Sequence, residues 1–397
     1  MEWSRRRGAP ICPAFVFSDR QIDPGRNPYF SPAAYSYMRG ALRELRDELG
    51  GGLWVYRVRD GRPDTDLLEA MHPRPSAVFF NRDVTPFARD RDAGIEGWCT
   101  ERGVHFDAGV DGEGYTLWRP GAVLTAAGTV PRVFSVFLAR VGAAPAPVPA
   151  PGGGLRTAAV SAPRRFLATG LPPVVDIHVP GHAVSMAALE RGDFDSYGDT
   201  RDDYNTPTTA ISAALKFGRV SARAFWRAVS FRRVHALLRQ IVWREYYYHL
   251  AWAYPHVLSG ESNSHIRPDR QRKQWPRPDA RKLRSWIEGR TGDPLVDASM
   301  AVLRETGHLH NRLRMVVASY LTKDLGIDWR AGEAAMATML VDYDPCQNSG
   351  GWQSVDAQVP GREIKSTAQM RKYGPVTRIH TRTRDLLLHA VGDAPAR

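Results

Sequence analysis

Short apolar runs alternate with helical patterns over the first 140 residues of the chain. AFVF (14–17), LWVY (53–56) and AVFF (77–80) are too continuous for half-exposed strands and are typical of strands buried on both faces. Between them, residues 32–49 have helical spacing that ends at three consecutive glycines, and residues 88–102 form a second helical pattern. Strands that alternate with helices indicate βαβ units, so we expect an α/β domain with a doubly wound parallel sheet.

The pattern changes after residue 140. Residues 141–165 are rich in Ala, Pro and Gly, which is typical of a semi-rigid linker. We therefore predict an α/β domain over residues 1–140, a linker over 141–165 and an all-α domain over 166–397. In the last of these, the helical patterns lie near residues 208–216, 221–252, 279–290, 296–305, 309–325 and 330–340.

The composition excludes several classes of protein. With 397 residues, 43% of them hydrophobic, the chain can bury a sizeable core and is not a disordered chain. Cys12, Cys99 and Cys346 lie far apart, so neither a disulfide framework nor a cysteine-based zinc site is expected. We see no secretory signal core, and no apolar run reaches the roughly 18–20 residues of a membrane span. The expectation is a soluble, intracellular monomer without metal, in cytoplasm, nucleoid or nucleus.

Positive charge and tryptophan both concentrate in the second half of the chain. The net charge is +12, of which residues 151–397 carry +11, and seven of the eleven tryptophans lie between residues 226 and 352. Concentrated positive charge suggests a polyanionic partner such as nucleic acid, and clustered indoles suit stacking on bases or on a flat cofactor. The alternatives are arginines spread over solvated faces and tryptophans that fill a core.

Four segments of the helical region contain residues suited to chemistry. In residues 197–223, Thr208, Thr209 and Ser212 crowd a predicted helix start, where they can hold a phosphate or simply cap the helix. In RQIVWREYYYHL (239–250), one helical face carries an amide, an indole, a guanidinium and a phenol, which suits base recognition or a boundary face with polar tips.

The other two segments are TGHLHNRLRMVVASYLTKDLGIDW (306–329) and LVDYDPCQNSGGWQ (340–353). Arg314 lies among apolar residues and needs an acidic partner if it is buried, which Asp342 or Asp344 can supply. Gly350 and Gly351 allow the backbone to pass close to a ligand.

Taken in this order, the four segments resemble the FAD domain of the photolyase/cryptochrome family. The long matches are HNRLRMVVASYLTKDL, IDWRAGE and NSGGWQ, and the similarity runs from about residue 11 to about residue 390. VFSDRQIDPGRNPYFSPAA and NRDVTPFARDRD are similar to the antenna domain of that family. HNRLRM together with GGW looks like the class I-like cyclobutane pyrimidine dimer photolyases.

The resemblance implies a light-driven enzyme that repairs cyclobutane pyrimidine dimers in DNA by electron transfer from reduced FAD to the flipped-out dimer. A second, antenna chromophore of folate or deazaflavin type is also implied. The rival interpretations are a cryptochrome-like blue-light photoreceptor and a non-catalytic DNA-binding remnant.

Individual roles also follow from the resemblance. FAD contacts are assigned to Tyr197, Thr208, Thr209, Ala210, Ile211, Ser212, Arg314, Asp342, Tyr343 and Asp344, with Arg314 paired to Asp342. Asn348 matches the asparagine beside flavin N5. Lesion and DNA contacts are assigned to Arg201, Gln240, Trp243, Arg244, Asn311, Arg312 and Met315. An electron-transfer chain from the surface to the flavin is assigned to Trp275, Trp329 and Trp352.

The chain departs from the family pattern at several positions. Gln240 replaces a glutamate usual in dimer photolyases, His308 stands where a tryptophan is common, and Ser354 replaces the second aromatic residue of GGWQW. Family members also place a strand about 40 residues before the one that matches AFVF, so we expect the sheet to lack its first strand.

Overall fold

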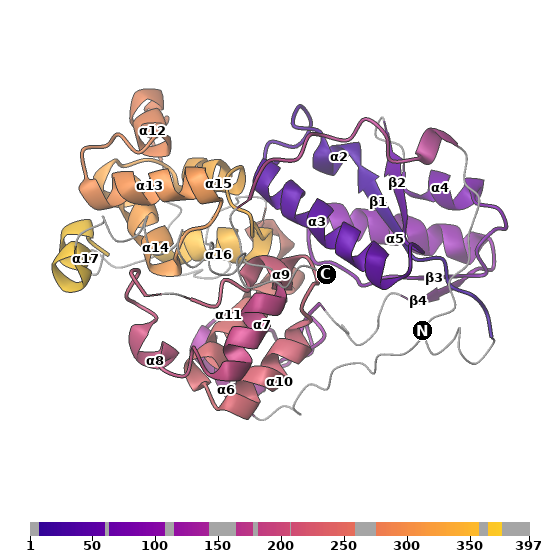
Figure 1. Ribbon diagram of the computed structural model, residues 1–397, viewed down its shortest axis with the longest axis horizontal. Coiled ribbons are helices and arrows are strands. Elements are labelled where there is room, and N and C mark those ends of the chain that lie inside the picture. The colour runs from indigo at the N-terminus through magenta and orange to yellow at the C-terminus, as the bar shows by residue number, and fades with distance from the viewer. Residues whose placement is uncertain are drawn as a thin grey trace.

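The computed structural model describes residues 8–59, 63–107, 115–142, 164–177, 182–206, 208–258, 275–356 and 364–374. The described chain forms an α/β part and a helical part that lie beside each other (Figure 1). The predicted linker over residues 141–165 falls mostly outside the described residues. No helix within the described ranges is both long and apolar enough to span a bilayer.

The α/β part contains two pairs of parallel strands. β1 (Ala14–Ser18) pairs with β2 (Trp54–Val58), and β3 (Ala77–Phe79) pairs with β4 (His105–Asp107). The two pairs are not hydrogen-bonded to each other among the described residues. The helices of this part are α2 (Asp19–Ile22), α3 (Pro32–Glu48), α4 (Thr65–Ala70) and α5 (Pro86–Glu101). The predicted α/β class with parallel strands is confirmed, although the pattern missed the short strand β4 and the short helices α2 and α4.

Helix α3 shows how the local sequence sets these boundaries. The Ser31 side chain caps the helix by accepting a hydrogen bond from the backbone N–H of Ala34, and Pro32 occupies the first turn, where its missing N–H costs nothing. The helix ends before Gly50 and Gly51, which have φ angles of 59° and 84° that glycine adopts without strain.

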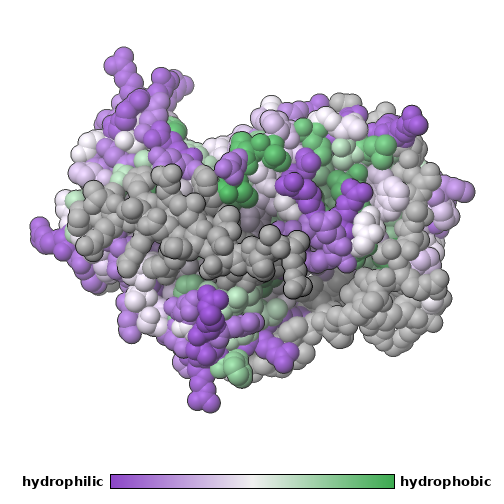
Figure 2. Space-filling view, in the orientation of Figure 1, coloured by the Kyte–Doolittle hydropathy of each residue, from purple (hydrophilic) through white to green (hydrophobic). Residues whose placement is uncertain are grey.

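The helical part contains several apolar clusters, the largest of which lies among helices α12 (Ala280–Ile287) to α16 (Pro345–Asp356). Trp286, Leu313, Val317 and Leu340 are each 0% exposed at its centre. On the face shown in Figure 2, hydrophilic residues dominate the coloured surface of this part. Its helices are α7 (His182–Arg191), α8 (Tyr197–Thr200), α9 (Ser212–Lys216), α10 (Ala222–Arg232), α11 (His235–Ala253), α12 (Ala280–Ile287), α13 (Pro294–Thr306), α14 (Asn311–Ser319), α15 (Trp329–Ala337), α16 (Pro345–Asp356) and α17 (Ser366–Tyr373).

Three predicted helices differ from the observed ones. The pattern over 221–252 forms two helices, α10 and α11, because Arg233 adopts a left-handed φ of 57° and ends α10. The sequence has no glycine at this position that would have predicted the break. The pattern over 309–325 is α14 followed by a π-helical turn over Tyr320–Asp324. The pattern over 208–216 becomes helical only at Ser212.

Helix α6 (Phe134–Val141) precedes the predicted linker but packs on the helical part. Phe137 is 0% exposed in a cluster with Tyr246 and Leu250 of α11. The buried carboxylate of Glu245 accepts hydrogen bonds from the backbone N–H groups of Leu117 (2.7 Å) and Trp118 (3.4 Å). The chain on both sides of the linker therefore contributes to the structure around α11.

Candidate functional site

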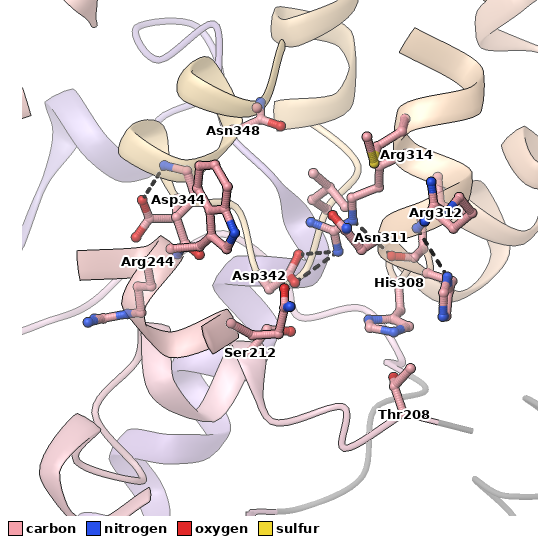
Figure 3. Close-up of a pocket in the computed structure, with 18 of the residues that line it drawn as sticks. Thr208, Ser212, Arg244, His308, Asn311, Arg312, Arg314, Asp342, Asp344 and Asn348 are labelled. Atoms are coloured by element: carbon pink, nitrogen blue, oxygen red, sulfur yellow. Dashed lines mark hydrogen bonds and ion pairs between the residues drawn. The ribbon is translucent and has the colours of Figure 1, made fainter. Parts of the chain in front are cut away.

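A cavity of about 540 Å³ lies in the helical part. Its walls come from the segment before α9 and from α11, α14 and α16, which are far apart in the sequence. Volumes of this size are typical of sites that enclose small molecules and cofactors. Figure 3 shows side chains from these elements converging on one space.

Most of the predicted site residues line this cavity. From the predicted cofactor set these are Tyr197, Thr208, Thr209, Ala210, Ile211, Ser212, Arg314, Asp342, Asp344 and Asn348. From the predicted lesion set these are Arg201, Gln240, Trp243, Arg244, Asn311, Arg312 and Met315.

Tyr343 was predicted to contact the cofactor, but it does not line the cavity. Its hydroxyl donates to Glu333 at 3.3 Å, and its ring stacks on Tyr29 at a centroid distance of 6.2 Å. Its neighbours Asp342 and Asp344 do line the cavity. The Tyr343 side chain, between these two aspartates in the sequence, therefore faces Glu333 and not the cavity.

Arg314 and Asp342 form the ion pair that the sequence predicted. Both carboxylate oxygens accept from Nη2 of Arg314, at 3.0 and 2.9 Å. Burial by itself would raise the pKa of Asp342, but the charge of Arg314, with further contributions from His308 and Ser212, brings that pKa below its usual value. Asp342 is therefore a carboxylate held in place at the centre of the group in Figure 3.

Asp344 belongs to a second buried network. Its Oδ2 accepts from Lys216 at 3.3 Å and from the hydroxyl of Tyr248, while its Oδ1 accepts from the backbone N–H of Gln347 at 3.1 Å. Burial opposes ionisation, but Lys216, Tyr248 and Arg244 bring the pKa of Asp344 below its usual value. Asp344 is 3% exposed, so this network fixes a charged oxygen pair at the cavity wall.

Arg244 lies deeper than its predicted role in DNA binding suggested. It is 4% exposed, pairs with Glu245 at 2.9 Å, and places its guanidinium over the rings of Tyr248 and Tyr115 at 4.5 and 5.3 Å. A guanidinium at this depth cannot reach a phosphate of DNA bound outside. The position of Arg244 therefore suits a contact with a ligand inside the cavity and does not suit a contact with the DNA backbone.

Asn348 is oriented by a buried carboxylate. Its Nδ2 donates to Oε1 of Glu333 at 3.0 Å, and Glu333 is 7% exposed. Because this bond occupies the amide NH₂ group, the amide oxygen of Asn348 is available to the cavity that the residue lines.

Trp243 stands in an aromatic group at the cavity wall. Phe134 of α6 lies parallel to its ring at a centroid distance of 3.5 Å and an angle of 4°. Tyr247 stacks on it at 5.7 Å and hydrogen-bonds through its hydroxyl to Ser354 at 3.2 Å. Ser354, which departs from the family pattern, thus holds Tyr247 next to Trp243. Trp243 lines the cavity and Phe134 does not, so Phe134 supports Trp243 from outside the cavity.

Charged residues gather at another part of the wall. Arg312 forms an ion pair with Asp202, and the backbone N–H of Arg312 donates to Nδ1 of His310 at 3.1 Å. Burial and the nearby charges lower the pKa of His310 to about 4, and burial also lowers the pKa of His308. Both histidines are therefore neutral near pH 7, and the positive charge here comes from Arg201 and Arg312.

The three tryptophans of the predicted electron-transfer chain share the large apolar cluster. Trp352 is 3% exposed and lines the cavity, whereas Trp329 and Trp275 do not line it. Trp286, which the sequence did not single out, meets Trp352 edge to face at a centroid distance of 6.1 Å.

The two adjacent glycines of NSGGWQ lie inside helix α16 rather than in a turn. A Cβ on Gly350 would approach Cδ1 of Tyr247 to 2.3 Å, whereas a Cβ on Gly351 would meet nothing within 4 Å. The first glycine thus allows close packing between α16 and α11.

This pair of glycines gives a matched prediction for the stability of the protein without ligand. Gly350→Ala should lower the free energy of unfolding by about 1–3 kcal/mol, because the methyl group would displace the Tyr247 ring. Gly351→Ala should leave it equal or raise it by up to about 1 kcal/mol, since alanine favours a helix. Urea denaturation of both variants measures this, and equal effects would contradict the packing described for Gly350.

Several residues that shape the site were not predicted, namely Phe134, Asp202, Lys216 and Glu333. Asp202 follows Arg201 directly in the sequence, so the sequence already places a carboxylate next to a predicted DNA contact. The other three act through residues distant in the sequence, and no local pattern marks them. Among the described residues, no group of three or more His, Cys, Asp or Glu side chains is placed to hold a metal ion.

Comparisons with known proteins agree with this site. Residues 1–152 match the family model described as DNA photolyase, and residues 237–382 match the FAD binding domain of DNA photolyase. The deoxyribodipyrimidine photo-lyase of Halobacterium salinarum is 31% identical over 404 residues, covering 92% of this chain and 80% of that protein. The deoxyribodipyrimidine photo-lyase of a Synechococcus strain is 31% identical, covering 81% of this chain and 71% of that protein.

Solved structures share the fold. A bacterial class III photolyase from Agrobacterium tumefaciens matches with a TM-score of 0.74 at 24% identity, over 99% of this chain and 89% of that one. A photolyase from Sulfolobus tokodaii with two FAD molecules matches with a TM-score of 0.70 at 25% identity, over 97% and 94%. Both parts of the fold and the sequence relatives therefore lead to one conclusion, that the chain belongs to the photolyase/cryptochrome family, with an N-terminal α/β photolyase domain followed by a helical FAD-binding domain.

Proposed function

We propose that the cavity binds FAD and that the protein uses it under blue light to split cyclobutane pyrimidine dimers in DNA, as a class I-like photolyase. The observation that carries the proposal is the meeting of two residue sets in one cavity. Residues suited to a cofactor and residues suited to an unstacked base come from separate segments and line the same 540 Å³ space. A second, antenna chromophore of folate or deazaflavin type stays a prediction.

The residues present suit FAD. Thr208, Thr209 and Ser212 offer hydroxyl groups, and the segment that carries them offers backbone N–H groups for a pyrophosphate. Nη2 of Arg244 is buried without a hydrogen-bond partner in the protein. An unpaired buried donor costs about 1–3 kcal/mol, so a ligand atom that accepts from it would stabilise the site.

Bound and reduced, the flavin would supply the electron that opens the cyclobutane ring. The protein's own part is to bind and orient the lesion. Trp243, fixed by Phe134 and Tyr247, offers a flat ring for a flipped-out dimer. Gln240 and Asn311 offer amide groups to the base edges, and both are neutral, so Gln240 recognises the lesion without the charge usual at its position.

The DNA backbone would be held by Arg201 and Arg312 at the wall of the cavity. The ion pair between Arg312 and Asp202 keeps the guanidinium oriented, and a phosphate would compete with this carboxylate. Arg312 is 21% exposed in its side chain, which leaves it accessible to DNA.

Arg312→Gln is expected to weaken binding of dimer-containing DNA and to reduce the slope of log affinity against log salt by about one unit, as expected for one lost phosphate contact. Arg74→Gln is the matched control, because Arg74 also pairs with a carboxylate but is 53% exposed in the α/β part. Fluorescence anisotropy at several salt concentrations measures both. An Arg312→Gln slope equal to that of Arg74→Gln would remove Arg312 from the DNA contacts.

A photoreceptor function is the second candidate, since Cryptochrome-1 of Anopheles gambiae is 28% identical over 90% of this chain. Ser354 in place of an aromatic residue also leaves the dimer one fewer ring to pack against. The lesion-facing set around Trp243 favours repair, because signalling to a protein partner requires no such set.

The test is repair of a single-stranded oligonucleotide that carries one thymine dimer. The protein is loaded with FAD, reduced, and illuminated with blue light or kept dark. We expect loss of the dimer in the light only, and a greatly reduced yield with Trp243→Ala. Protein that holds reduced FAD and binds the oligonucleotide but leaves the dimer intact would favour the photoreceptor or the remnant.

A further inference from the structure

Lys216 is a cation next to the cavity that neither the cofactor nor the lesion needs to touch. It lies at the end of α9, its side chain is 18% exposed, and it is not among the residues that line the cavity. Its Nζ lies 3.3 Å from Oδ2 of Asp344, which does line the cavity. Burial would lower the pKa of Lys216, but the carboxylate of Asp344 outweighs this and raises it, so the lysine is charged.

Two ion pairs lie around Asp344, and Asp83 is a further carboxylate that acts on Lys216. Arg244 is matched by Glu245 at 2.9 Å, and Lys216 is matched by Asp344. Tyr248 donates to the same oxygen of Asp344 and itself lies 2.7 Å from the hydroxyl of Tyr115, so the neutral neighbours hold the carboxylate in place without changing its charge. Without Lys216, Asp344 would lose its ion-pair partner, and Arg244, which also acts on it, is itself paired with Glu245.

We propose that Lys216 is a positioning residue that offsets the charge of Asp344 and thereby favours the reduced form of the flavin. This rests on the proposed function, in which FAD occupies the cavity. Two electrons that arrive with one proton add one negative charge to the flavin ring. A carboxylate with no ion-pair partner at the cavity wall repels that charge, and Lys216 offsets the repulsion.

The test is a redox titration of the FAD-loaded protein with dithionite in the presence of an indicator dye. For Lys216→Met, we expect the ratio of reduced to oxidised flavin at a fixed potential to fall at least tenfold, which corresponds to about 30 mV for a two-electron couple. Lys216→Arg keeps the charge and should stay within threefold of the parent protein.

Lys323→Met is the matched control, because Lys323 also contacts an aspartate, Asp356, is 22% exposed, and does not line the cavity. It should leave the ratio unchanged. An unchanged ratio in Lys216→Met would overturn the proposal, as would an equal fall in the Lys323→Met control.

Loss of FAD from Lys216→Met with retention of FAD in Lys216→Arg would support the same charge argument through binding. Loss of FAD in both would overturn it, because it would assign Lys216 a packing role instead. If the parent protein itself takes up no FAD, the proposed function fails, and this outcome is distinct from a failure of Lys216 alone.

Discussion

Trp352→Phe is expected to abolish light-driven reduction of the bound flavin while repair by chemically reduced protein persists. Trp352 is the member of the predicted tryptophan chain that lines the cavity, and it is 3% exposed. Trp329 and Trp275 do not line the cavity, so an electron that enters through either needs a carrier closer to the ligand, and Trp352 is placed to be that carrier. Phenylalanine keeps the apolar packing but is much harder to oxidise than an indole. Flavin absorbance during illumination with an external electron donor measures the effect.

Trp286 provides the matched control for this prediction. It contacts Trp352 at a centroid distance of 6.1 Å and is 0% exposed, but its Nε1 donates to the backbone oxygen of Val317 at 3.0 Å, so it has a structural role of its own. Trp286→Phe should therefore leave flavin reduction largely intact, whereas Trp329→Phe should slow it. Loss of reduction in Trp286→Phe, with normal reduction in Trp329→Phe, would place the route through Trp286 instead.

Arg314→Met should destabilise the folded protein and prevent FAD binding. The substitution leaves the carboxylate of Asp342, whose side chain is 5% exposed, without its cation. Breaking a buried pair in this way costs about 3–5 kcal/mol, and the lower end applies because the Arg314 side chain is 25% exposed. Denaturant unfolding with and without added FAD measures both effects.

Two further variants separate charge from geometry at this site. Arg330→Met removes a guanidinium from a more exposed pair with Asp328, which is worth at most about 1 kcal/mol, and should retain FAD. Arg314→Lys keeps the charge but loses the bond from Nε to the backbone oxygen of Leu309 at 2.8 Å, and should lie between the two. Equal losses in Arg314→Met and Arg330→Met would contradict the role of the buried pair.

One long-range contact of the candidate site could be predicted from the sequence. Arg314 in an apolar stretch required a buried acid, which left Asp342 and Asp344 as candidates, and the family resemblance selected Asp342, which is the observed partner. The helix break at Arg233 and the helical course of NSGGWQ could not be predicted in this way. A left-handed arginine and two glycines inside a helix are held by packing with other segments, which local patterns do not contain.

The same limit explains the residues that were missed. Phe134 precedes the predicted linker and reaches Trp243 only because α6 packs on α11. Tyr343 alternates with Asp342 and Asp344 in the sequence but turns toward Glu333, and only the fold decides which of the three face the cavity. The residue types in the sequence thus indicated what kind of ligand the site could bind. Long-range packing determined which side chains line the cavity.

If the cavity holds a flavin in reach of a flipped-out dimer, one absorbed photon is enough to repair that dimer. A single-turnover experiment measures this. The protein with reduced FAD is mixed with an excess of an oligonucleotide that carries one thymine dimer, and the ultraviolet absorbance of restored thymine is followed after one short blue flash. We expect a rise that saturates with flash energy at no more than one repaired dimer per bound flavin, and a much smaller rise with Trp243→Ala. Bound, reduced flavin and bound dimer with no rise after the flash would contradict the proposed function.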